Sequence, residues 1–419
     1  MHKFEIEGGR VLSGALDASG SKNSALPLLF ATILSDQAVT LTRVPHLRDI
    51  TTTVQLLKGI GADISHENGV AKIEIKNLSS TEAPYELVRT MRASILMLGP
   101  LLARARKAKV SLPGGCSIGT RPVDIHLQAL EKMGATLKLE SGYIVGECPN
   151  GLKGAEIEFR FPSVGATEHV MMAASLAEGK TVIRNAAREP EIVDLAQMLR
   201  KMGVEISGEG SSEIIIQGAS SLKPIAHEVM HDRIEAGTLL LAGPITGGKV
   251  RVNRVNPEAL TAFTDLLKKA GVKVGIGPDW IEAERGSSEH GLKFATEPFP
   301  GFPTDLQAQF MAYLAQIGAQ SEIVETIFEN RFMHVPELNR LGADIRVEGG
   351  SAHVHGKKAC FQGAVVMATD LRASASLVLA GLAGRGETTV RRIYHLDRGY
   401  EELEKKLLQI NARIRRAPD

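Results

Sequence analysis

Residues 56–64 read LLKGIGADI, and this phrase of helix end, glycine and strand start returns five more times along the chain. The other copies are ALEKMGATL at 129–137, MLRKMGVEI at 198–206, LLKKAGVKV at 266–274, ELNRLGADI at 337–345 and KLLQINARI at 406–414. Successive copies lie 68 to 73 residues apart. Each places Gly, or Asn411 in the last copy, where a helix C-cap takes the left-handed conformation. The chain is therefore an array of six repeats.

Each repeat reads as helix, strand, helix, strand, strand. An apolar helix rich in small residues precedes the phrase, as in ATILSDQAVTLTRV at 31–44, and a hairpin follows it. Asn68-Gly69 has the chemistry of a type I′ turn between two alternating strands. Helices with Ala, Gly and Ser faces can approach one another closely, so we expect an α/β (α+β) fold with helices inside and sheets outside. An open solenoid of six units is the alternative, although solenoid repeats are usually shorter.

The sixth copy ends at Ile414 without a return strand, whereas the chain opens with the alternating strand HKFEIEGG at 2–9. The opening strand can complete the last repeat. We therefore predict two domains of three repeats each, one at 22–229 and a discontinuous one at 1–21 and 230–419.

Composition excludes several classes of function. The 419 residues carry 49 Lys and Arg against 48 Asp and Glu, so no global charge attracts nucleic acid. No apolar run reaches the roughly 18 to 20 residues needed to cross a bilayer, so no membrane insertion is expected. Three cysteines in unpaired spacing argue against disulfides and structural zinc, and favour a cytoplasmic location. No metal site is predicted.

The second repeat departs most from the pattern. Between its strand and its second helix it carries LPGGCSIGTRPVD at 112–124, a loop of three glycines and two prolines around Cys116. Arg121 is close enough in sequence to lower the pKa of this thiol. We interpret Cys116 as reactive, and Cys148 and Cys360 as small buried side chains.

Basic residues stand in polar or turn contexts that favour anion binding. Several enter helices rich in Ala, Ser and Leu, where free N–H groups and the helix dipole attract an anion. The set is Lys22, Arg92, Arg331, Arg372 and Arg398. The expected ligand is small and multiply anionic. The phosphate-binding GxxxxGK[ST] frame is missing from the sequence, which excludes nucleotide hydrolysis through that motif.

Two acids open predicted helices. Asp370 and Asp305 both suit a helix N-cap. Asp305, however, follows the rigid segment FPGFP at 299–303, which can aim a carboxylate toward a ligand. We therefore interpret Asp305 as a candidate catalytic base.

Nine ordered motifs together resemble the UDP-N-acetylglucosamine 1-carboxyvinyltransferase family of the EPSP synthase superfamily. They are SGSKNSALPLLFATIL, TMRASIL, LPGGCSIGTRPVDIHLQALEKMGA, FPSVGATEHVMMAA, NAAREPEIVDLA, DRIEAGTLL, GFPTDLQAQ, ENRFMHVPELNRLGA and ATDLRASASLVLAG. The resemblance implies transfer of the enolpyruvyl group of phosphoenolpyruvate to the 3-hydroxyl of UDP-N-acetylglucosamine, the first committed step of peptidoglycan synthesis. It implies a two-domain inside-out α/β barrel with its active site in the cleft between the domains. It also implies no cofactor and no metal, and a monomer or weak homo-oligomer.

The resemblance also implies roles for individual residues. Cys116 would protonate the vinyl methylene and be labelled by a phosphonate epoxide, and Asp305 would act as base at the sugar hydroxyl. Lys22 and Arg398 join these two as the implied catalytic set. The residues implied for phosphoenolpyruvate are Lys22, Asn23, Arg121, Arg331, Arg372 and Arg398. The residues implied for the sugar nucleotide are Arg92, Arg121, Pro122, Val123, Asp124, Ile125, Ser163, Val164, Gly165, Asp305 and Ile327. His126 matches a position important for conformation.

One departure from the family pattern is visible, because many relatives carry Lys just before the SVG turn where this chain has Phe161-Pro162. Two alternatives remain open. The first is enolpyruvyl transfer to shikimate 3-phosphate on the same fold, against which the Cys116 loop argues. The second is a non-enzymatic repeat scaffold, against which the arginine set and the thiol argue.

Overall fold

The computed structural model describes residues 2–89, 91–112 and 123–419. These residues form two compact units, each with its own hydrophobic core. The first unit comprises residues 20–89, 91–112 and 123–230, and the second unit comprises residues 2–19 and 231–419. The chain therefore passes from one unit to the other near residue 19 and again near residue 230.

In the described part of the chain, each unit holds three four-stranded sheets. The sheets of the first unit are, in spatial order, β14 (Ile225–Glu228), β3 (Val39–Thr42), β5 (Val70–Glu74) and β4 (Asp63–Glu67); β6 (Glu82–Ala83), β7 (Lys107–Ser111), β9 (Tyr143–Glu147) and β8 (Thr136–Glu140); and β10 (Glu156–Glu158), β11 (Lys180–Arg184), β13 (Glu213–Gln217) and β12 (Glu205–Ser207). In each sheet the first pair is parallel and the other two pairs are antiparallel.

The second unit repeats the arrangement with strands drawn from both ends of the chain. Its sheets are β16 (Lys273–Ile276), β17 (Trp280–Glu284), β15 (Lys249–Asn253) and β2 (Ser13–Asp17); β18 (Lys293–Ala295), β19 (Gln320–Val324), β21 (Ser351–His355) and β20 (Ile345–Glu348); and β22 (Val365–Met367), β23 (Glu387–Arg391), β1 (His2–Glu7) and β24 (Arg413–Pro418). The opening strand β1 pairs antiparallel with both β23 and β24, with His2 opposite Pro418. This is the pairing that the sequence predicts for that strand.

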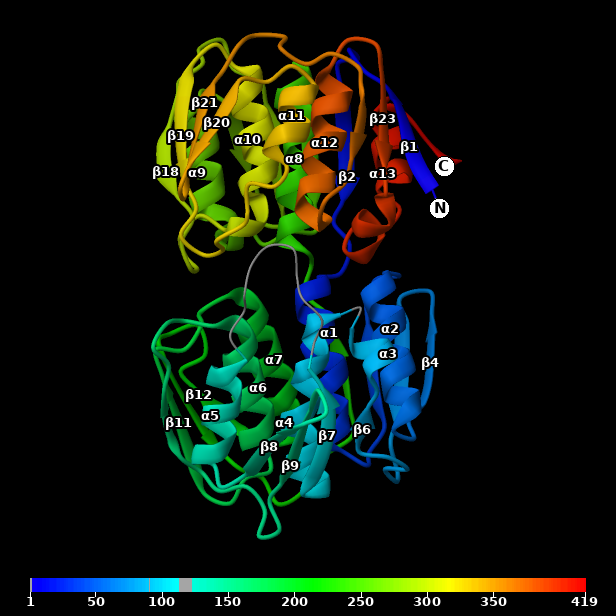
Figure 1. Cartoon of the computed structure of the whole chain (residues 1–419), viewed down its shortest axis with the longest axis vertical. Coiled ribbons are helices and arrows are strands. Elements are labelled where there is room, and N and C mark those ends of the chain that lie inside the picture. Colours follow the sequence, from blue (N-terminus) through cyan, green and yellow to red (C-terminus); the bar gives the residue numbers. More distant parts are fainter. Residues whose placement is uncertain (1, 90, 113–122) are drawn as a thin grey trace. The chain divides into compact units, whose positions relative to one another are not determined.

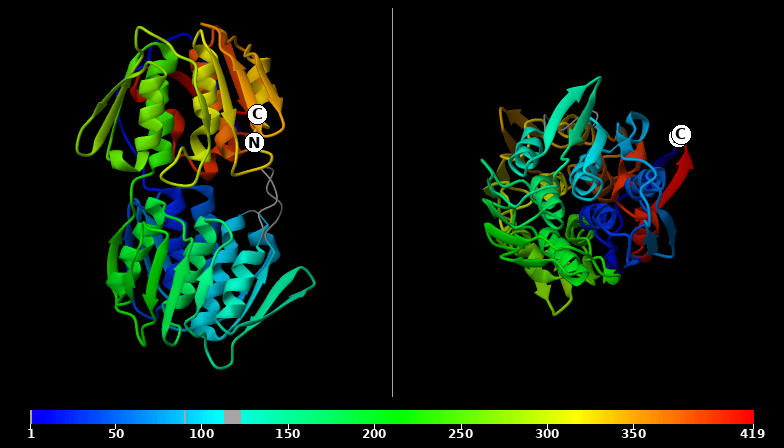
Figure 2. Two further views of the ribbon diagram at one scale, coloured as in Figure 1. Left: turned by 90° about the vertical axis from the view of Figure 1, so that its left-hand side faces the viewer. Right: turned by 90° about the horizontal axis from the view of Figure 1, so that it is seen from below.

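Three buried helices lie side by side inside the strands of each unit (Figures 1 and 2). They are α1 (Lys22–Ala31), α4 (Leu98–Ala105) and α6 (Val164–Ala174) in the first unit, and α8 (Arg233–Thr246), α10 (Gln307–Gln316) and α12 (Leu371–Ala383) in the second. Small residues allow these inner helices to lie close to their neighbours. A Cβ added at Gly237 of α8, for example, would lie 2.6 Å from Cδ1 of Leu306. The prediction of helices inside and sheets outside is confirmed.

The outer helices are amphipathic and end at the repeated glycine. They are α2 (Arg48–Gly59), α5 (Asp124–Lys132) and α7 (Pro190–Met202), then α9 (Thr261–Lys269), α11 (Val335–Arg340) and α13 (Leu403–Gln409); α3 (Tyr85–Val88) and the 3₁₀ turns η1 (Thr32–Leu34), η2 (Arg92–Met97), η3 (Pro257–Leu260), η4 (Thr304–Leu306) and η5 (Ile393–Arg398) complete the set. All six capping residues have φ between 71° and 108°, as predicted.

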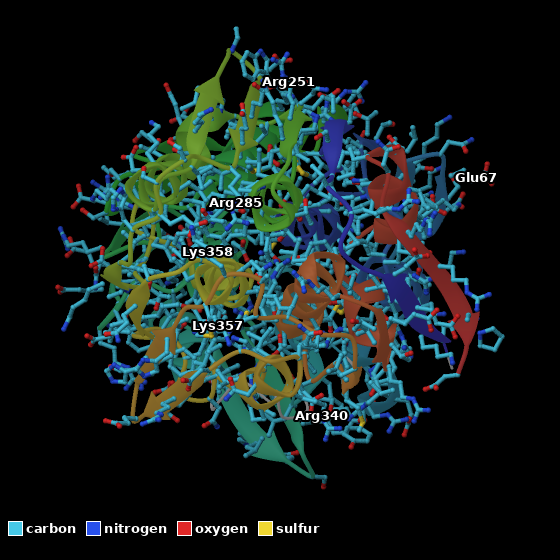
Figure 3. The ribbon with its side chains drawn as sticks, turned by 90° about the horizontal axis from the view of Figure 1, so that it is seen from above. Glu67, Arg251, Arg285, Arg340, Lys357 and Lys358 are labelled. Carbon is cyan, nitrogen blue, oxygen red and sulfur yellow. The ribbon has the colours of Figure 1, made fainter. Side chains whose placement is uncertain are left out.

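The hairpin at Asn68-Gly69 also forms as predicted, because both residues have positive φ and join β4 to β5. Cys148 and Cys360 are buried free thiols, as interpreted from the sequence. Between β17 and β18, Glu289 forms ion pairs with Arg285 and Lys358, two residues labelled in Figure 3. Among the described residues, none of the helices is both long enough and apolar enough to span a bilayer.

Candidate functional site

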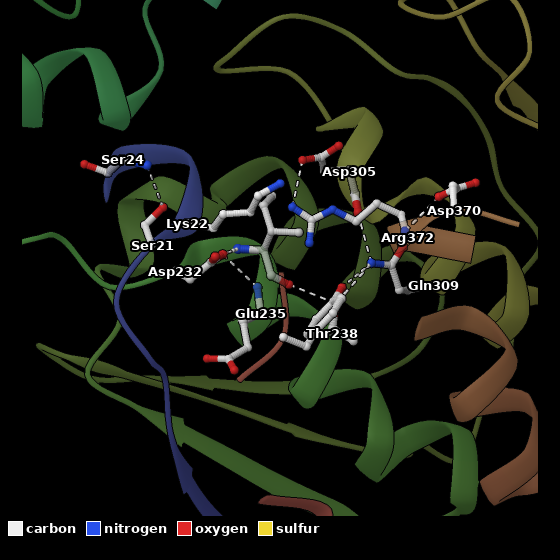
Figure 4. Close-up of polar contacts among 12 residues, drawn as sticks. Ser21, Lys22, Ser24, Asp232, Glu235, Thr238, Asp305, Gln309, Asp370 and Arg372 are labelled. Carbon is white, nitrogen blue, oxygen red and sulfur yellow. Dashed lines mark hydrogen bonds and ion pairs between the residues drawn. The ribbon is translucent and has the colours of Figure 1, made fainter. Parts of the chain in front are cut away.

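Asp305 lies in the second unit between two buried arginines. Its Oδ1 accepts a hydrogen bond from Nη2 of Arg331 at 2.9 Å. Its Oδ2 accepts one from Nη2 of Arg372, also at 2.9 Å (Figure 4). Each arginine side chain is 4% exposed, whereas that of Asp305 is 26% exposed. One carboxylate thus faces two guanidinium groups, and the cluster carries a net positive charge.

Arg372 owes its position to the start of α12. Asp370 caps this helix by accepting hydrogen bonds from the backbone N–H groups of Arg372 and Ala373, at 2.8 and 3.0 Å. Burial acts to lower the pKa of Arg372, but the charge of Asp305 opposes this effect, and the net pKa is raised. Within the described part of the chain, its buried Nη1 has no hydrogen-bond partner. A buried charged donor in this state is suited to an anionic ligand.

Three polar side chains lie beside Arg372 and were not predicted from the sequence. Nε2 of Gln309 donates to the hydroxyls of Thr238 and Tyr400, at 3.1 and 3.0 Å, and these two hydroxyls lie 2.9 Å apart. The Arg372 guanidinium carbon lies 5.5 Å from the centroid of the Tyr400 ring. The three side chains come from α8, α10 and the segment after η5, so only the packed helices bring them together.

Glu325 is a fourth residue that the sequence did not single out. It follows β19, and its carboxylate accepts hydrogen bonds from the Thr304 hydroxyl and from the backbone N–H of Ile327, both at 2.9 Å. Thr304 begins the turn that holds Asp305. Glu325 therefore connects the loop of the predicted residue Ile327 with the turn of Asp305.

Arg398 ends η5 and is partly buried. This turn packs against α12, the helix that begins beside Arg372. The structure thus joins three predicted residues of the second unit, Asp305, Arg331 and Arg372, by direct contact. It places Arg398 on the neighbouring element.

In the first unit, the predicted residues lie at the starts of helices. Lys22 is the first residue of α1, and its Nζ forms a 2.9 Å ion pair with the buried carboxylate of Asp49 on α2. Ser21 caps α1 by accepting from the backbone N–H of Ser24 at 3.3 Å (Figure 4). Asn23 is the next residue of the helix and is partly buried. Asp49 was not predicted as a partner of Lys22.

The residues of the first unit that are predicted for the sugar nucleotide and lie in the described part of the chain are also found at helix starts. Arg92 begins η2, Asp124 begins α5 after the cap position Val123, and Ser163 caps α6. Helices α5 and η2 both pack against α6, which brings these starts into one region of the first unit. Val164 and Gly165 form the first turn of α6, whereas Ile125 is buried in the core. Free N–H groups at helix starts favour an anion.

Three predicted residues, Cys116, Arg121 and Pro122, lie outside the described residues. The departure at Phe161-Pro162 does lie within them. Phe161 is 40% exposed, and the guanidinium carbon of Arg160 lies 5.3 Å from its ring centroid. Arg160 also forms a 2.8 Å ion pair with Asp124.

Comparison with known proteins gives consistent results over the whole chain. Residues 6–407 match the family model described as EPSP synthase (3-phosphoshikimate 1-carboxyvinyltransferase). The chain is 54% identical over 420 residues to the UDP-N-acetylglucosamine 1-carboxyvinyltransferase of Acidiphilium cryptum, and 52% identical over 419 residues to that of Trichlorobacter lovleyi. In both comparisons the match covers 100% of each chain.

Two solved structures are similar to the whole chain. The enolpyruvyl transferase NikO from Streptomyces tendae has a TM-score of 0.90 and 26% sequence identity, and the match covers 100% of this chain and 99% of that one. The EPSP synthase of Acinetobacter baumannii has a TM-score of 0.77 with 100% of both chains covered. At 19% identity, the second likeness concerns the fold alone.

Proposed function

Because the chain belongs to the EPSP synthase family, we propose that it transfers the enolpyruvyl group of phosphoenolpyruvate to the 3-hydroxyl of UDP-N-acetylglucosamine, with release of phosphate. The observation that carries this proposal is the full-length identity of just over one half with relatives named for that reaction. The product would enter peptidoglycan synthesis.

The cluster around Asp305 supports the binding of phosphoenolpyruvate. Phosphoenolpyruvate carries a carboxylate and a phosphate, and guanidinium groups bind the oxygens of both through paired hydrogen bonds. We assign the carboxylate to Arg331 and Arg372, the second of which has the buried Nη1 without a partner among the described residues. We assign the phosphate to Lys22, Asn23, Arg121 and Arg398. In this proposal both units supply residues to one reaction.

The reaction has two steps. In the first, the Cys116 thiol gives its proton to the methylene carbon of phosphoenolpyruvate, and Asp305 accepts the proton of the sugar 3-hydroxyl. That oxygen then forms a bond to the central carbon, and a tetrahedral adduct results. In the second step, the methyl group returns a proton to the Cys116 thiolate and the vinyl double bond forms again. Phosphate leaves with the electrons of its C–O bond and takes up the proton held by Asp305. General acid catalysis and general base catalysis each typically raise a reaction rate about 10²- to 10⁴-fold.

The helix starts of the first unit support the binding of the sugar nucleotide. We assign its anionic part to Arg92, Arg121 and the first turn of α6 at Ser163, Val164 and Gly165, with Pro122, Val123, Asp124, Ile125 and Ile327 as further contacts. Both substrates are phosphorylated metabolites, which supports a cytoplasmic location. We propose a monomer or a weak homo-oligomer.

Measurement of inorganic phosphate tests the proposal. The purified chain is incubated with phosphoenolpyruvate and either UDP-N-acetylglucosamine, shikimate 3-phosphate or no acceptor. We expect phosphate with the sugar nucleotide alone, together with an equal amount of enolpyruvyl product by mass spectrometry. Phosphate release with shikimate 3-phosphate but not with the sugar nucleotide would replace this function by the other one on the same fold. No release with either acceptor would favour a non-enzymatic scaffold.

A further inference from the structure

Two buried histidines of the first unit contact each other near the proposed sugar-nucleotide residues. His126 lies on α5 and His169 on α6, and their Nδ1 atoms are 3.0 Å apart. The ring centroids are separated by 5.2 Å with the planes tilted by 50°. His126 is 8% exposed and His169 is fully buried. A hydrogen bond between two like nitrogen atoms requires that one ring donates and the other accepts.

The backbone of Gly99 decides which ring donates. Gly99 lies in the first turn of α4, where backbone N–H groups have no partner within the helix. Its N–H donates to Nε2 of His169 at 2.6 Å. A backbone N–H can only donate, so Nε2 of His169 holds a lone pair. Only glycine permits this approach, because a Cβ at position 99 would lie 2.6 Å from Cδ2 of the His169 ring.

Both rings are neutral at physiological pH. Burial, followed by the positive charge of Arg92, lowers the pKa of His126 to about 4 despite the opposing charge of Asp124. Burial also lowers the pKa of His169 well below its usual value. A neutral His169 that accepts at Nε2 carries its proton on Nδ1. It therefore donates to Nδ1 of His126, whose own proton must then lie on Nε2.

Nε2 of His126 lies beside the first turn of α6. A Cβ added at Gly165 would lie 3.5 Å from Cε1 and 3.8 Å from Nε2 of the His126 ring. Gly165 follows Ser163, which caps α6, so several N–H groups of this turn lack a partner within the helix. Arg92 is close enough to act on the charge of the His126 ring. The ring nitrogen, the helix start and the guanidinium group are all donors, and together they match an acceptor with several anionic oxygens.

We propose that His169 is a positioning residue that fixes the tautomer of His126, so that Nε2–H of His126 donates to an anionic oxygen of the sugar nucleotide at the start of α6. The identity of the ligand in this inference rests on the proposed function. The assignment of the two histidine tautomers does not depend on it. A His126 of the opposite tautomer would present a lone pair to the same oxygen and repel it. Gly99, His169 and His126 thus form a chain of hydrogen bonds from a buried backbone group to the ligand.

The tautomers are measured first, by long-range proton–nitrogen NMR of the full chain with labelled histidine. We expect His169 to carry its proton on Nδ1 and His126 on Nε2, with no change between about pH 6 and pH 8. Saturating UDP-N-acetylglucosamine should shift the Nε2–H signal of His126. Opposite tautomers, a protonated ring or an unmoved His126 signal with ligand bound would each overturn the proposal. This measurement needs no variant that might misfold.

Two variants of one residue then separate positioning from structure. In His169→Asn, the amide nitrogen can replace Nδ1–H and still donate to His126, whereas the bond from Gly99 is lost. In His169→Gln, the amide oxygen can replace Nε2 and still accept from Gly99, whereas the donor to His126 is lost. Each variant loses one buried hydrogen bond, so their melting temperatures should fall similarly.

The kinetic result should differ between the pair. We expect His169→Asn to keep KM for the sugar nucleotide within about twofold, and His169→Gln to raise it about tenfold, since a hydrogen bond to a charged oxygen is affected. KM for phosphoenolpyruvate should stay unchanged in both. Equal KM values for the two variants would overturn the positioning role. If the unmodified chain gave no phosphate release with the sugar nucleotide, the proposed function would fail. The NMR measurement would still test the predicted tautomers of His126 and His169.

Discussion

At the scale of single residues, Asp305 has two tasks that a substitution should reveal together. Asp305→Asn keeps the shape but cannot accept the hydroxyl proton, so turnover should fall about 10²- to 10⁴-fold. The same change leaves Arg331 and Arg372 without their shared counter-charge, so the melting temperature should also fall. Steady-state phosphate release and thermal unfolding measure the two effects.

Asp370→Asn is the matched control, because Asn caps a helix about as well as Asp does. Asp370 caps α12 through backbone N–H groups, so its variant should keep both turnover and stability near the original values. A turnover of Asp305→Asn within tenfold of the unmodified chain would remove Asp305 from the role of base.

Glu168 is a buried carboxyl on α6 whose ionisation should weaken the fold. Burial, with the nearby charges of Glu191 and Glu189, raises its pKa well above 4.5. The native state therefore binds one more proton than the unfolded chain does once the pH exceeds about 4.5, and stability must fall as pH rises through this range. Glu168→Gln cannot ionise. Its stability advantage over the unmodified chain should therefore grow with pH above about 4.5.

Urea unfolding at several values between about pH 4.5 and pH 8 measures this difference. Glu131→Gln, at an exposed position of α5, is the control and should follow the pH dependence of the unmodified chain. If Glu168→Gln did the same, Glu168 would have to be ionised in the native state or neutralised by a partner.

The candidate site was predictable where a residue type stands at a helix start. Lys22, Arg92 and Arg372 could be found in this way, because the local sequence alone fixes such positions. Gln309, Tyr400 and Glu325 could not, since each acts through hydrogen bonds to residues that are distant in sequence. No periodicity records such contacts, which arise only when the inner helices pack.

At the scale of elements, the repeated cap offers a test of backbone conformation alone. Gly134 has a φ of +96°, and no atom lies within 4 Å of a Cβ built there. Gly134→Ala should therefore cost about 1 kcal/mol of unfolding free energy from the left-handed conformation alone. Asn at the same position should cost less, as Asn411 indicates in the sixth repeat. Urea unfolding of the two variants measures the difference.

Gly59→Ala is the control for this prediction. Gly59 ends α2 without a positive φ, and an added Cβ there also meets no atom within 4 Å. Alanine should stabilise this position by up to about 0.5 kcal/mol. A loss at Gly59 equal to that at Gly134 would show that conformation is not the cause.

The elements that the sequence predicted share a strong local signal. The six caps and the hairpin at Asn68-Gly69 follow from residues that tolerate positive φ, and the core strands follow from alternation. The short strands β6, β10, β14, β18 and β22 were missed. Each has only two to four residues, too few to show a period, and each is a strand only because a parallel neighbour supplies its partners.

At the scale of the whole molecule, the pairing of β1 with β24 allows the chain to be reordered. His2 lies opposite Pro418, so a short glycine-rich linker can join the two ends. New ends can open between Ser141 and Gly142, which are exposed and form the turn between β8 and β9. We expect this circular permutant to melt within a few degrees of the original chain and to keep phosphate release.

A second permutant, opened between Ile144 and Val145 inside β9, is the control. These residues pair with β7 and β8 on both sides, so new ends there should prevent folding. Thermal unfolding and gel filtration compare the two products. Aggregation of the permutant opened at 141–142 would contradict the prediction, because it would mean that the order of the repeats, and not only their pairing, determines the fold.

The position of β1 between β23 and β24 also determines how long this strand stays unpaired while the chain is synthesised. At about 5 to 20 residues per second, the ribosome needs roughly 20 to 80 seconds to reach β23 after it has made β1. In that interval the first unit can complete its three sheets, since all their strands lie between residues 39 and 228. During this time the backbone N–H and C=O groups on both edges of β1 have no partner strand. Its charged residues Lys3, Glu5 and Glu7 alternate with Phe4 and Ile6, which hinders pairing with other nascent chains until its own partners emerge.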